Sequence, residues 1–507
     1  MMNNVWVLIC LLLISCSKKD QNNEEEEPVV QRTPIEVSSM KTTIGGRRYL
    51  TVDNKLFLML GAQLRTDYFI QLDKRKLDQL DDYFALAKSM NITVLQVPIA
   101  WRDVEYEKDK YTRDMINHII GYCEKYDLKL EILWYGSYMC GYSVRGYIPN
   151  YVVDDVINYP QLKPSVSFIG WLGKHFYLKP NTPLLVERES KALSYMMDAI
   201  YDYNQLNGNK LTVVGIQIQN EADMLATRHN NEHGYTPESI WPDLIDMMAT
   251  LGRVVKSSAY KCYTRTNLTT TYDDFIERSK QIVLKGGVDF VGLDPYTDQV
   301  NVISNMLTDL HAIPNNFAHI GENGGEYPNN DILTLKALIQ GAGYSIFEVV
   351  TTPHEYLKDW TLRGVYNPDF SKKSHTNRIM DAYKIYKNAW CDFAIAETKN
   401  MVGFNIKNNE LSSSLMESHS TESVRFNWNT NNSGIGYALE NNDYVIVSST
   451  KSDEITMQSL GNKQIDSKAE VGYYDIEGSW IKESEVNIQN NKLSLLATKT
   501  YRIKLVL

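Results

Sequence analysis

Hydrophobic positions between residues 56 and 349 follow two alternating spacings. Short runs of β-branched and aliphatic residues are each followed by a segment in which apolar residues recur every three or four positions. The first spacing predicts buried strands, and the second predicts amphipathic helices. The predicted strands are residues 56–61, 92–97, 128–134, 211–219, 261–265, 288–294, 317–321 and 343–349.

Helices are predicted in most of the intervals between these strands. Thr236-Pro237, for example, is a start signal for a helix through residue 255. Eight alternations of apolar strand and helix predict an α/β fold, a (β/α)8 TIM barrel, in which function lies at the carboxyl ends of the strands. A doubly wound open sheet is the alternative. It is disfavoured because no glycine-rich nucleotide turn follows an early strand.

The segments on either side of this pattern differ from it. Residues 41–53 alternate around Gly45-Gly46, which predicts a hairpin that caps the floor of the barrel. Beyond residue 402, short alternating runs are separated by Asn, Ser and Gly clusters, as expected of an antiparallel β-sandwich. We therefore expect a barrel domain with its hairpin over residues 36–400 and a C-terminal β-sandwich over residues 401–507.

Two glutamates follow predicted strands of the barrel. Strand four ends in Asn220-Glu221, and strand seven ends in Glu322. The separation of 101 residues (322 − 221) fits about three βα units of roughly 30 residues each. A single glutamate after a strand is as easily explained as a helix cap or as a surface carboxylate. A pair at two strand ends predicts hydrolysis of a glycosidic bond, which needs a proton donor and a nucleophile.

The motifs Gly215-Ile-Gln-Ile-Gln-Asn-Glu221 and Ile320-Gly-Glu322 resemble those of the retaining glycoside hydrolases of clan A. The strand-four segment is most similar to the β-galactosidases of families 35 and 42, and the resemblance extends over about residues 45–400. It implies a double displacement on β-linked glycans, with Glu221 as acid/base and Glu322 as nucleophile. Exo action, as in β-galactosidases, is expected. The alternatives are another clan A specificity (β-glucosidase, mannosidase or endo-glycanase) and a non-catalytic glycan-binding lipoprotein.

The resemblance and the strand-end positions assign further substrate-binding residues. Asn220 is expected to bind the sugar 2-hydroxyl, Arg65 to favour an ionised nucleophile, and Tyr296 to hydrogen-bond Glu322. We expect pocket walls and hydroxyl acceptors at Trp101, Glu105, Trp134, Tyr135 and Glu348. No tryptophan ends strand eight, although one is common in the clan.

The N-terminus predicts export and lipidation. Val5 to Ile14 form an apolar run too short to cross a bilayer, and Leu13-Ile-Ser-Cys16 is typical of a bacterial lipobox. We expect a signal peptide over residues 1–15, acylation of Cys16, and a disordered acidic tether over residues 16–35. An acidic stretch after the lipidated cysteine resembles the surface-export signal of Bacteroides-type lipoproteins. A lipid-anchored protein of the cell envelope, in the outer membrane and facing outward, is therefore expected.

Composition narrows the choice of partners. The formal net charge is −10, and no Lys/Arg cluster offers a phosphate-binding surface, so nucleic acid is not expected. The 33 tyrosines and 9 tryptophans suit an oligosaccharide or polysaccharide, since aromatic rings stack on sugar faces. His229-Asn-Asn-Glu232-His233 matches a zinc-peptidase pattern, but its residues make a poor helix. We expect no metal and no cofactor. Free thiols are expected at Cys123, Cys140, Cys262 and Cys391, with one disulfide as the alternative.

Overall fold

The computed structural model describes most of the chain from residue 32 onward. The described residues are 32–71, 76–162, 169–170, 173–227, 236–270, 273–352, 363–407, 410–411, 420–428 and 434–506. The predicted signal peptide, the lipidation site Cys16 and the segment His229 to His233 lie outside these residues. Within the described residues, no helix is long and apolar enough to cross a membrane.

Eight parallel strands close into a barrel, which confirms the predicted (β/α)8 fold. Their spatial order is β13-β15-β16-β17-β18-β5-β6-β9, so neighbours in sequence are also neighbours in space. The strands are β5 (Leu60–Gln63), β6 (Val94–Ala100), β9 (Lys129–Met139), β13 (Val213–Asn220), β15 (Tyr263–Thr269), β16 (Phe290–Asp294), β17 (His319–Gly324) and β18 (Gly343–Phe347).

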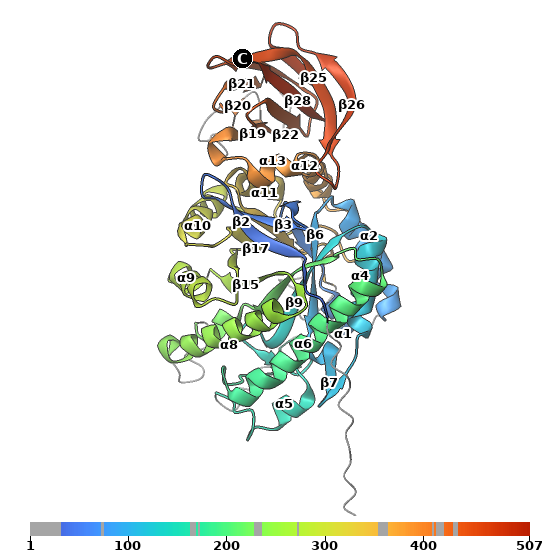
Figure 1. Cartoon of the computed structure of the whole chain (residues 1–507), viewed down its shortest axis with the longest axis vertical. Helices are drawn as coiled ribbons and strands as arrows, with labels where there is room; N and C mark the ends of the chain where they lie inside the picture. Colours follow the sequence, from blue (N-terminus) through green and yellow to red (C-terminus); the bar gives the residue numbers. More distant parts are fainter. Residues whose placement is uncertain are drawn as a thin grey trace, which may run out of the picture. The chain divides into compact units, whose positions relative to one another are not determined.

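Amphipathic helices pack around these strands (Figure 1). In α4 (Asp114–Lys125) the buried residues recur at the predicted spacing, from Met115 to Cys123. The other long helices of the barrel are α2 (Asp81–Ser89), α6 (Pro183–Leu206), α8 (Pro237–Ser257), α9 (Phe275–Lys285), α10 (Val300–Ala312) and α11 (Asn330–Ile339). The sequence analysis did not predict α10, although its buried residues Ile303, Leu307 and Leu310 recur at the helical spacing of four and three positions.

Two strand boundaries differ from the prediction for physical reasons. The first barrel strand begins at Leu60 rather than at residue 56, because β4 (Lys55–Phe57) pairs with β3 (Arg48–Val52) instead. The third strand continues past its predicted end at Trp134 as far as Met139. Its pairing with β13 continues as far as Met139 opposite Asn220.

A small antiparallel sheet covers the amino ends of the barrel strands, as predicted for residues 41–53. It consists of β2 (Ser38–Thr42), β3 and β4. Leu50 and Val52 of β3 pack into one buried cluster with Met59, Val94, Val214, Tyr263, Phe290 and Phe317. Just before it, Ile35 at the end of the predicted tether already pairs with Tyr260, through the short strands β1 (Ile35–Glu36) and β14 (Tyr260–Lys261).

The C-terminal region is a sandwich of two antiparallel sheets, as predicted. The larger sheet has the order β20-β19-β22-β23-β28-β25-β26 and the smaller one β21-β24-β27. Apolar residues of both sheets, including Phe404, Phe426 and Ile503, form one core. The strands are β19 (Met401–Lys407), β20 (Glu410–Leu411), β21 (Val424–Trp428), β22 (Gly434–Glu440), β23 (Tyr444–Ser449), β24 (Asp453–Ser459), β25 (Gln464–Tyr474), β26 (Trp480–Asn487), β27 (Lys492–Leu495) and β28 (Thr500–Val506).

Two helices that the pattern did not predict connect the barrel to the sandwich. They are α12 (Thr376–Asn388) and α13 (Trp390–Ile395). The Tyr437 hydroxyl of β22 donates a hydrogen bond to the Ile385 carbonyl at 2.6 Å, and its ring lies edge-on to Phe393 with centroids 4.8 Å apart. The large buried cluster of the barrel therefore extends through these helices into the first strands of the sandwich.

Candidate active site

The two predicted catalytic glutamates lie at the carboxyl end of the barrel. Glu221 directly follows β13 and has a left-handed backbone (φ 45°), so the chain turns sharply there into a 3-10 helix, η2 (Ala222–Leu225). Glu322 lies in the carboxyl half of β17. Both side chains are buried, with 8% and 3% of their surface exposed. The fold thus brings together two carboxylates that are 101 residues apart in the sequence.

Three side chains donate hydrogen bonds to the Glu322 carboxylate. The Tyr296 hydroxyl donates to Oε2 at 2.5 Å, and the Gln63 amide donates to Oε1 at 3.0 Å. Asn267 Nδ2 lies 3.3 Å from the same Oε1. An ionised carboxylate only accepts hydrogen bonds, so this ring of donors fits a charged Glu322 and fixes its orientation. The predicted contact between Tyr296 and the glutamate of strand seven is present.

The surroundings of Tyr296 keep its hydroxyl protonated, so that it can donate a hydrogen bond. Burial and the nearby charge of Glu322 raise the pKa of its hydroxyl well above the usual value. The Arg363 guanidinium lies over its ring, 3.9 Å from the centroid. Because the phenol keeps its proton, it can stabilise negative charge on Glu322 without competing for it.

Asn267 on β15 links the two glutamates. Its Oδ1 accepts from the Glu221 backbone amide at 3.2 Å, while its Nδ2 faces Glu322. The same Nδ2 lies 3.1 Å from Asn220 Oδ1 and 2.6 Å from Asp294 Oδ2. The sequence pattern missed this residue, because the predicted strand five ended at residue 265. A strand continued to Thr269 would have placed Asn267 at the carboxyl end.

Asp294, the last residue of β16, is a third carboxyl group in the site. Burial, followed by the charges of Glu322 and Glu221, raises its pKa well above the usual range. The site therefore favours the protonated form of Asp294, and in that form the cluster carries less negative charge than three carboxylates would. The signal was present in the sequence, since Asp294 ends a predicted strand just as the two glutamates do.

Glu221 lies beside a thiol. Cys140, at the end of β9, hydrogen-bonds Glu221, and burial together with the glutamate charge raises the pKa of the thiol well above its usual value. The Cys140 amide donates to the Asn220 carbonyl at 2.8 Å, which ties the ends of β9 and β13 together. Asn220 Oδ1 accepts from Gln217 Nε2 at 2.9 Å, and Asn220 Nδ2 lies 3.8 Å from the Cys140 sulfur. The thiol is half-buried and protonated, so it acts as a neutral donor next to the expected proton donor.

Arg65, predicted to act on the nucleophile, makes a bidentate ion pair with Asp67. The two bonds measure 2.9 Å to Oδ1 and 2.7 Å to Oδ2. Its guanidinium also lies 3.6 Å from the centre of the Tyr68 ring and 5.4 Å from that of Tyr135. Burial raises the pKa of the Tyr135 hydroxyl well above its usual value, and both Arg65 and Glu322 lie close enough to influence it. Any effect of Arg65 on Glu322 is therefore moderated by the carboxylate of Asp67.

Glu348 follows β18 and faces the same cluster. Its carboxylate accepts from the Thr352 backbone amide at 2.9 Å and from the Thr352 hydroxyl at 3.0 Å. Burial raises its pKa to about 7, against the opposing charge of Arg65. Glu348 and Tyr135 thus both lie near Arg65 in the site.

Trp101, Glu105 and Trp134 make their polar contacts with one another and with α6. All three are fully buried between the barrel and α6. Trp101 Nε1 donates to Glu105 at 2.9 Å, and Glu105 also forms an ion pair with Arg188 of α6. Trp134 Nε1 donates to Glu189 of α6 at 2.9 Å. The polar atoms of these three residues are bonded inside the protein, and their place in the wall of a sugar pocket stays a prediction.

The four cysteines of the described chain are free, as expected, and Cys123 and Cys262 are buried. Within the part of the chain that the structure describes, no group of three or more His, Cys, Asp or Glu side chains is arranged to hold a metal ion.

Comparison with known proteins adds a family model and several solved structures. A model described as "Domain of unknown function (DUF4978)" matches residues 244–411. No curated protein matches the chain. The chain is similar to the exo-β-1,4-mannosidase Op5Man5 from Opitutaceae bacterium strain TAV5, with 12% identity and a TM-score of 0.48 over 72% of this chain and 63% of that one.

Two further structures are similar at a comparable level. The β-galactosidase from Marinomonas ef1 has 10% identity and a TM-score of 0.47, over 67% of this chain and 61% of that one. The β-glucuronidase from Bacteroides uniformis has 12% identity and a TM-score of 0.44, over 91% and 44%. The chain spans less than two thirds of the length of each of these proteins. At these identities and TM-scores the likeness carries no conclusion about the activity of this chain.

Proposed function

We propose that the protein is a retaining glycoside hydrolase that cleaves β-linked glycans, with Glu322 as nucleophile and Glu221 as acid/base. One observation carries the proposal: three donors orient the Glu322 carboxylate, and the Asn267 amide that provides one of them also holds the backbone of Glu221. Retaining hydrolysis requires this kind of pair, one fixed charged carboxylate and a second carboxyl group close to it.

The two glutamates divide the reaction between them. Glu322 attacks the anomeric carbon while Glu221 gives its proton to the leaving oxygen, so the glycosidic bond breaks and a glycosyl ester forms on Glu322. Glu221, now a carboxylate, removes a proton from a water molecule, and that water releases the sugar with its original configuration. As the carboxylate is esterified its charge disappears, and the Tyr296 hydroxyl remains beside the leaving carboxylate when the ester breaks.

Asn220 is positioned to bind the sugar. Its oxygen is used by Gln217 and Asn267, whereas its amide nitrogen has a long contact to the Cys140 sulfur. The nitrogen can therefore donate to the 2-hydroxyl, a contact that strengthens in the transition state. The raised pKa of Asp294 supports the mechanism, because a third negative charge would raise the cost of ionising Glu322.

The sugar specificity follows from the strand-four motif. We expect exo action on β-galactosides, with β-glucosidase, mannosidase and endo-glycanase activities as alternatives. Hydrolysis of a panel of p-nitrophenyl glycosides ranks them directly. A wild-type protein that binds glycans but hydrolyses none of a broad panel would instead be a non-catalytic glycan-binding protein.

Azide rescue tests the two roles. Glu322→Ala should stop turnover of an activated aryl glycoside, and added azide should give a glycosyl azide of inverted configuration, because the anion occupies the face left by the carboxylate. Glu221→Ala should still form the glycosyl ester, so that azide gives a product of retained configuration. Glu107→Ala, at an exposed carboxylate, is the matched control. Wild-type activity in both active-site variants would place the site elsewhere.

The cellular location is a separate part of the proposal. The lipobox at Cys16 and the acidic residues after it suit a lipid-anchored protein of the cell envelope that faces outward. Metabolic labelling with a fatty-acid analogue should mark the wild type and spare Cys16→Ala. Equal labelling of both proteins would contradict the anchor.

A further inference from the structure

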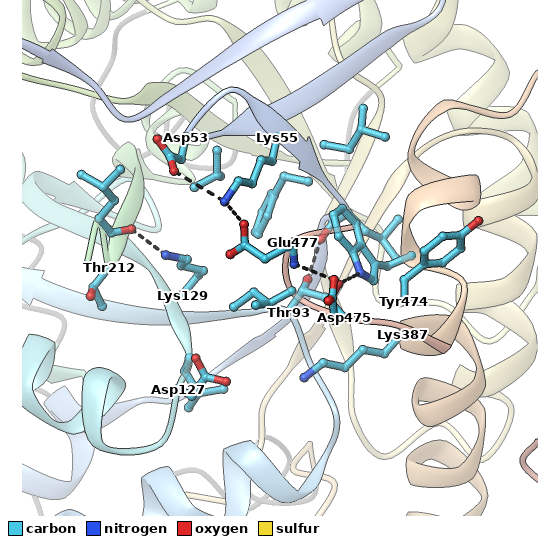
Figure 2. A pocket seen from close by; sticks show the side chains of 18 of the residues that line it. Asp53, Lys55, Thr93, Asp127, Lys129, Thr212, Lys387, Tyr474, Asp475 and Glu477 are labelled. Carbon is cyan, nitrogen blue, oxygen red and sulfur yellow. Dashed lines mark hydrogen bonds and ion pairs between the residues drawn. The ribbon is translucent and has the colours of Figure 1, made fainter. Parts of the chain in front are cut away.

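A cavity of about 680 Å³ lies at the amino ends of several barrel strands, and Figure 2 shows the side chains that line it. Its walls include residues at the amino ends of barrel strands: Thr93, Leu128 and Thr212 directly precede β6, β9 and β13, and Leu58 lies two residues before β5. The catalytic carboxylates follow the other ends of these parallel strands. A ligand in this cavity would therefore be separated from the catalytic site by the barrel itself, and would not be a substrate in position to react.

The far wall of the cavity comes from the C-terminal part of the chain. It is made by Lys387, Asn388 and Trp390, at the junction of α12 and α13, and by the turn between β25 and β26. This turn is well braced, since Asp475 Oδ1 accepts from the backbone amides of Glu477 and Ser479 at 3.0 and 2.8 Å. The cavity thus has fixed walls from both parts of the chain, as a binding site requires.

The apolar part of the lining contains an aromatic surface. Trp390 Nε1 donates to the Asp475 carbonyl at 3.1 Å, so its one polar group is already used and the remaining ring is apolar. Phe57, Leu56 and Leu58 line the cavity as well. Flat apolar rings combined with polar groups that converge on one space are typical of sites that stack and hydrogen-bond a ligand of moderate size.

The charges around the cavity nearly balance, which argues against a strongly charged ligand. Four lysines and five carboxylates line it. Lys55 pairs with Glu477, and Lys210 pairs with Glu124 at 3.0 Å. A phosphate or a metal cation would need an excess of one sign. A neutral ligand rich in hydroxyl groups meets donors and acceptors here without a charge penalty.

Lys387 is the polar group in the cavity that most needs an acceptor. Among the described residues its ammonium makes neither a hydrogen bond nor an ion pair, and no dashed line reaches it in Figure 2. Burial lowers its pKa. The ammonium of Lys129, by contrast, donates to the carbonyls of Lys210 and Leu211 at 2.9 and 3.1 Å. Lys387 therefore offers donors into the cavity that a hydroxyl oxygen can accept.

From this arrangement we infer that the cavity is a second, non-catalytic binding site for a neutral oligosaccharide of two or three sugar rings. The sugar would stack on Trp390 and accept a hydrogen bond from Lys387. The volume falls within the usual range of small-molecule sites, about 300–1,000 Å³. The choice of a saccharide rests on the proposed function, whereas the choice of a neutral, hydroxyl-rich ligand rests on the cavity alone.

Titration calorimetry on the full-length Glu322→Ala variant tests the inference with β-1,4-linked galactobiose, cellobiose and mannobiose. We expect one disaccharide to bind at two sites per chain. Adding Lys387→Met should weaken one site roughly tenfold, the effect of losing a charge-assisted hydrogen bond. Lys384→Met, an exposed position on the same helix outside the cavity, is the matched control and should leave both sites unchanged.

The alternative results separate this inference from the proposed function. Binding at one site, sensitive to Lys387→Met but unaffected by Glu221→Ala, would support the cavity and contradict the catalytic site. Binding at one site that is insensitive to Lys387→Met would overturn the cavity inference and leave the catalytic proposal standing. Tighter binding of digalacturonate than of every neutral disaccharide would overturn the assignment of a neutral ligand.

Discussion

The Tyr296 hydroxyl lies 2.5 Å from Oε2 of Glu322, although the two residues follow different strands of the barrel and are separated by 26 positions. A hydrogen bond from a neutral hydroxyl to an ionised carboxylate is about twice as strong as one between neutral groups. The Tyr296 hydroxyl is therefore placed to stabilise negative charge on the proposed nucleophile.

Removal of this donor should reduce catalysis without unfolding the protein. For Tyr296→Phe we expect kcat/KM on aryl glycosides to fall roughly 10- to 100-fold, since a hydrogen bond to a charged group contributes about 1.5–3 kcal/mol. Steady-state kinetics, with circular dichroism as the test of folding, measures this. Tyr106→Phe, at an exposed tyrosine, is the control. Unchanged kinetics in Tyr296→Phe would remove Glu322 from the role of nucleophile.

Asp294 should make the protein less stable as the pH rises. Its folded-state pKa is raised by burial and by the two glutamates, so above the unfolded pKa of about 3.9 the native state holds a proton that the unfolded state has released. The free energy of unfolding then falls with pH, by up to about 1.4 kcal/mol per pH unit, until the folded pKa is reached.

The Asp294→Asn variant isolates this effect. The difference in unfolding free energy, wild type minus variant, should decrease steadily from pH 5 to pH 8 in urea titrations. Parallel pH profiles for the two proteins would mean that Asp294 is ionised in the native state. The direction of this pH dependence, rather than its size, decides whether Asp294 is protonated or ionised in the native state.

Substitution or chemical modification of the Cys140 thiol should change the catalytic activity. A protonated thiol that donates to Glu221 can be replaced by a hydroxyl but not by a methyl group, so Cys140→Ser should keep more activity than Cys140→Ala. Methyl methanethiosulfonate should inactivate the wild type slowly, because the raised pKa leaves little thiolate. Cys391→Ala is the matched control and should be inactivated like the wild type. Inactivation of Cys140→Ala at the wild-type rate would contradict the assignment.

Glu105 should prove structural. Glu105→Gln leaves the buried Arg188 with Asp109 as its carboxylate partner, and loss of one partner of a buried ion pair typically costs about 3–5 kcal/mol. Urea denaturation should show this loss, while kcat/KM of the folded variant stays near wild type. Glu107→Gln, at an exposed carboxylate, should change neither quantity. If Glu105→Gln had wild-type stability but a reduced kcat/KM, Glu105 would instead contribute to the sugar site.

Strand positions could be predicted from the sequence because buried parallel strands are apolar along their whole length. This uniform apolar character gives no signal for the residue at which a strand ends. The pattern could not tell that β15 continues to Thr269 through a polar stretch, so Asn267 was missed. Likewise, apolar character did not distinguish Trp134 and Tyr138, which are fully buried inside the protein, from aromatic residues that could line a sugar pocket. Side-chain partners such as Arg188 come from elements distant in sequence, and no local pattern contains them.

The Asn267 amide has two hydrogens but lies within hydrogen-bonding distance of three oxygens, those of Asn220, Asp294 and Glu322. Its own oxygen accepts from the Glu221 backbone amide, so turning the amide over would not ease this shortage. Asn267 can therefore donate to only two of the three at a time, although Asn220 Oδ1 and Glu322 Oε1 also accept from Gln217 and Gln63. In the proposed reaction, esterification of Glu322 removes the negative charge of its carboxylate, so its oxygen becomes a weaker acceptor for the Asn267 amide. The hydrogen it held then becomes available to Asn220, at the stage when Asn220 is expected to hold the sugar most tightly.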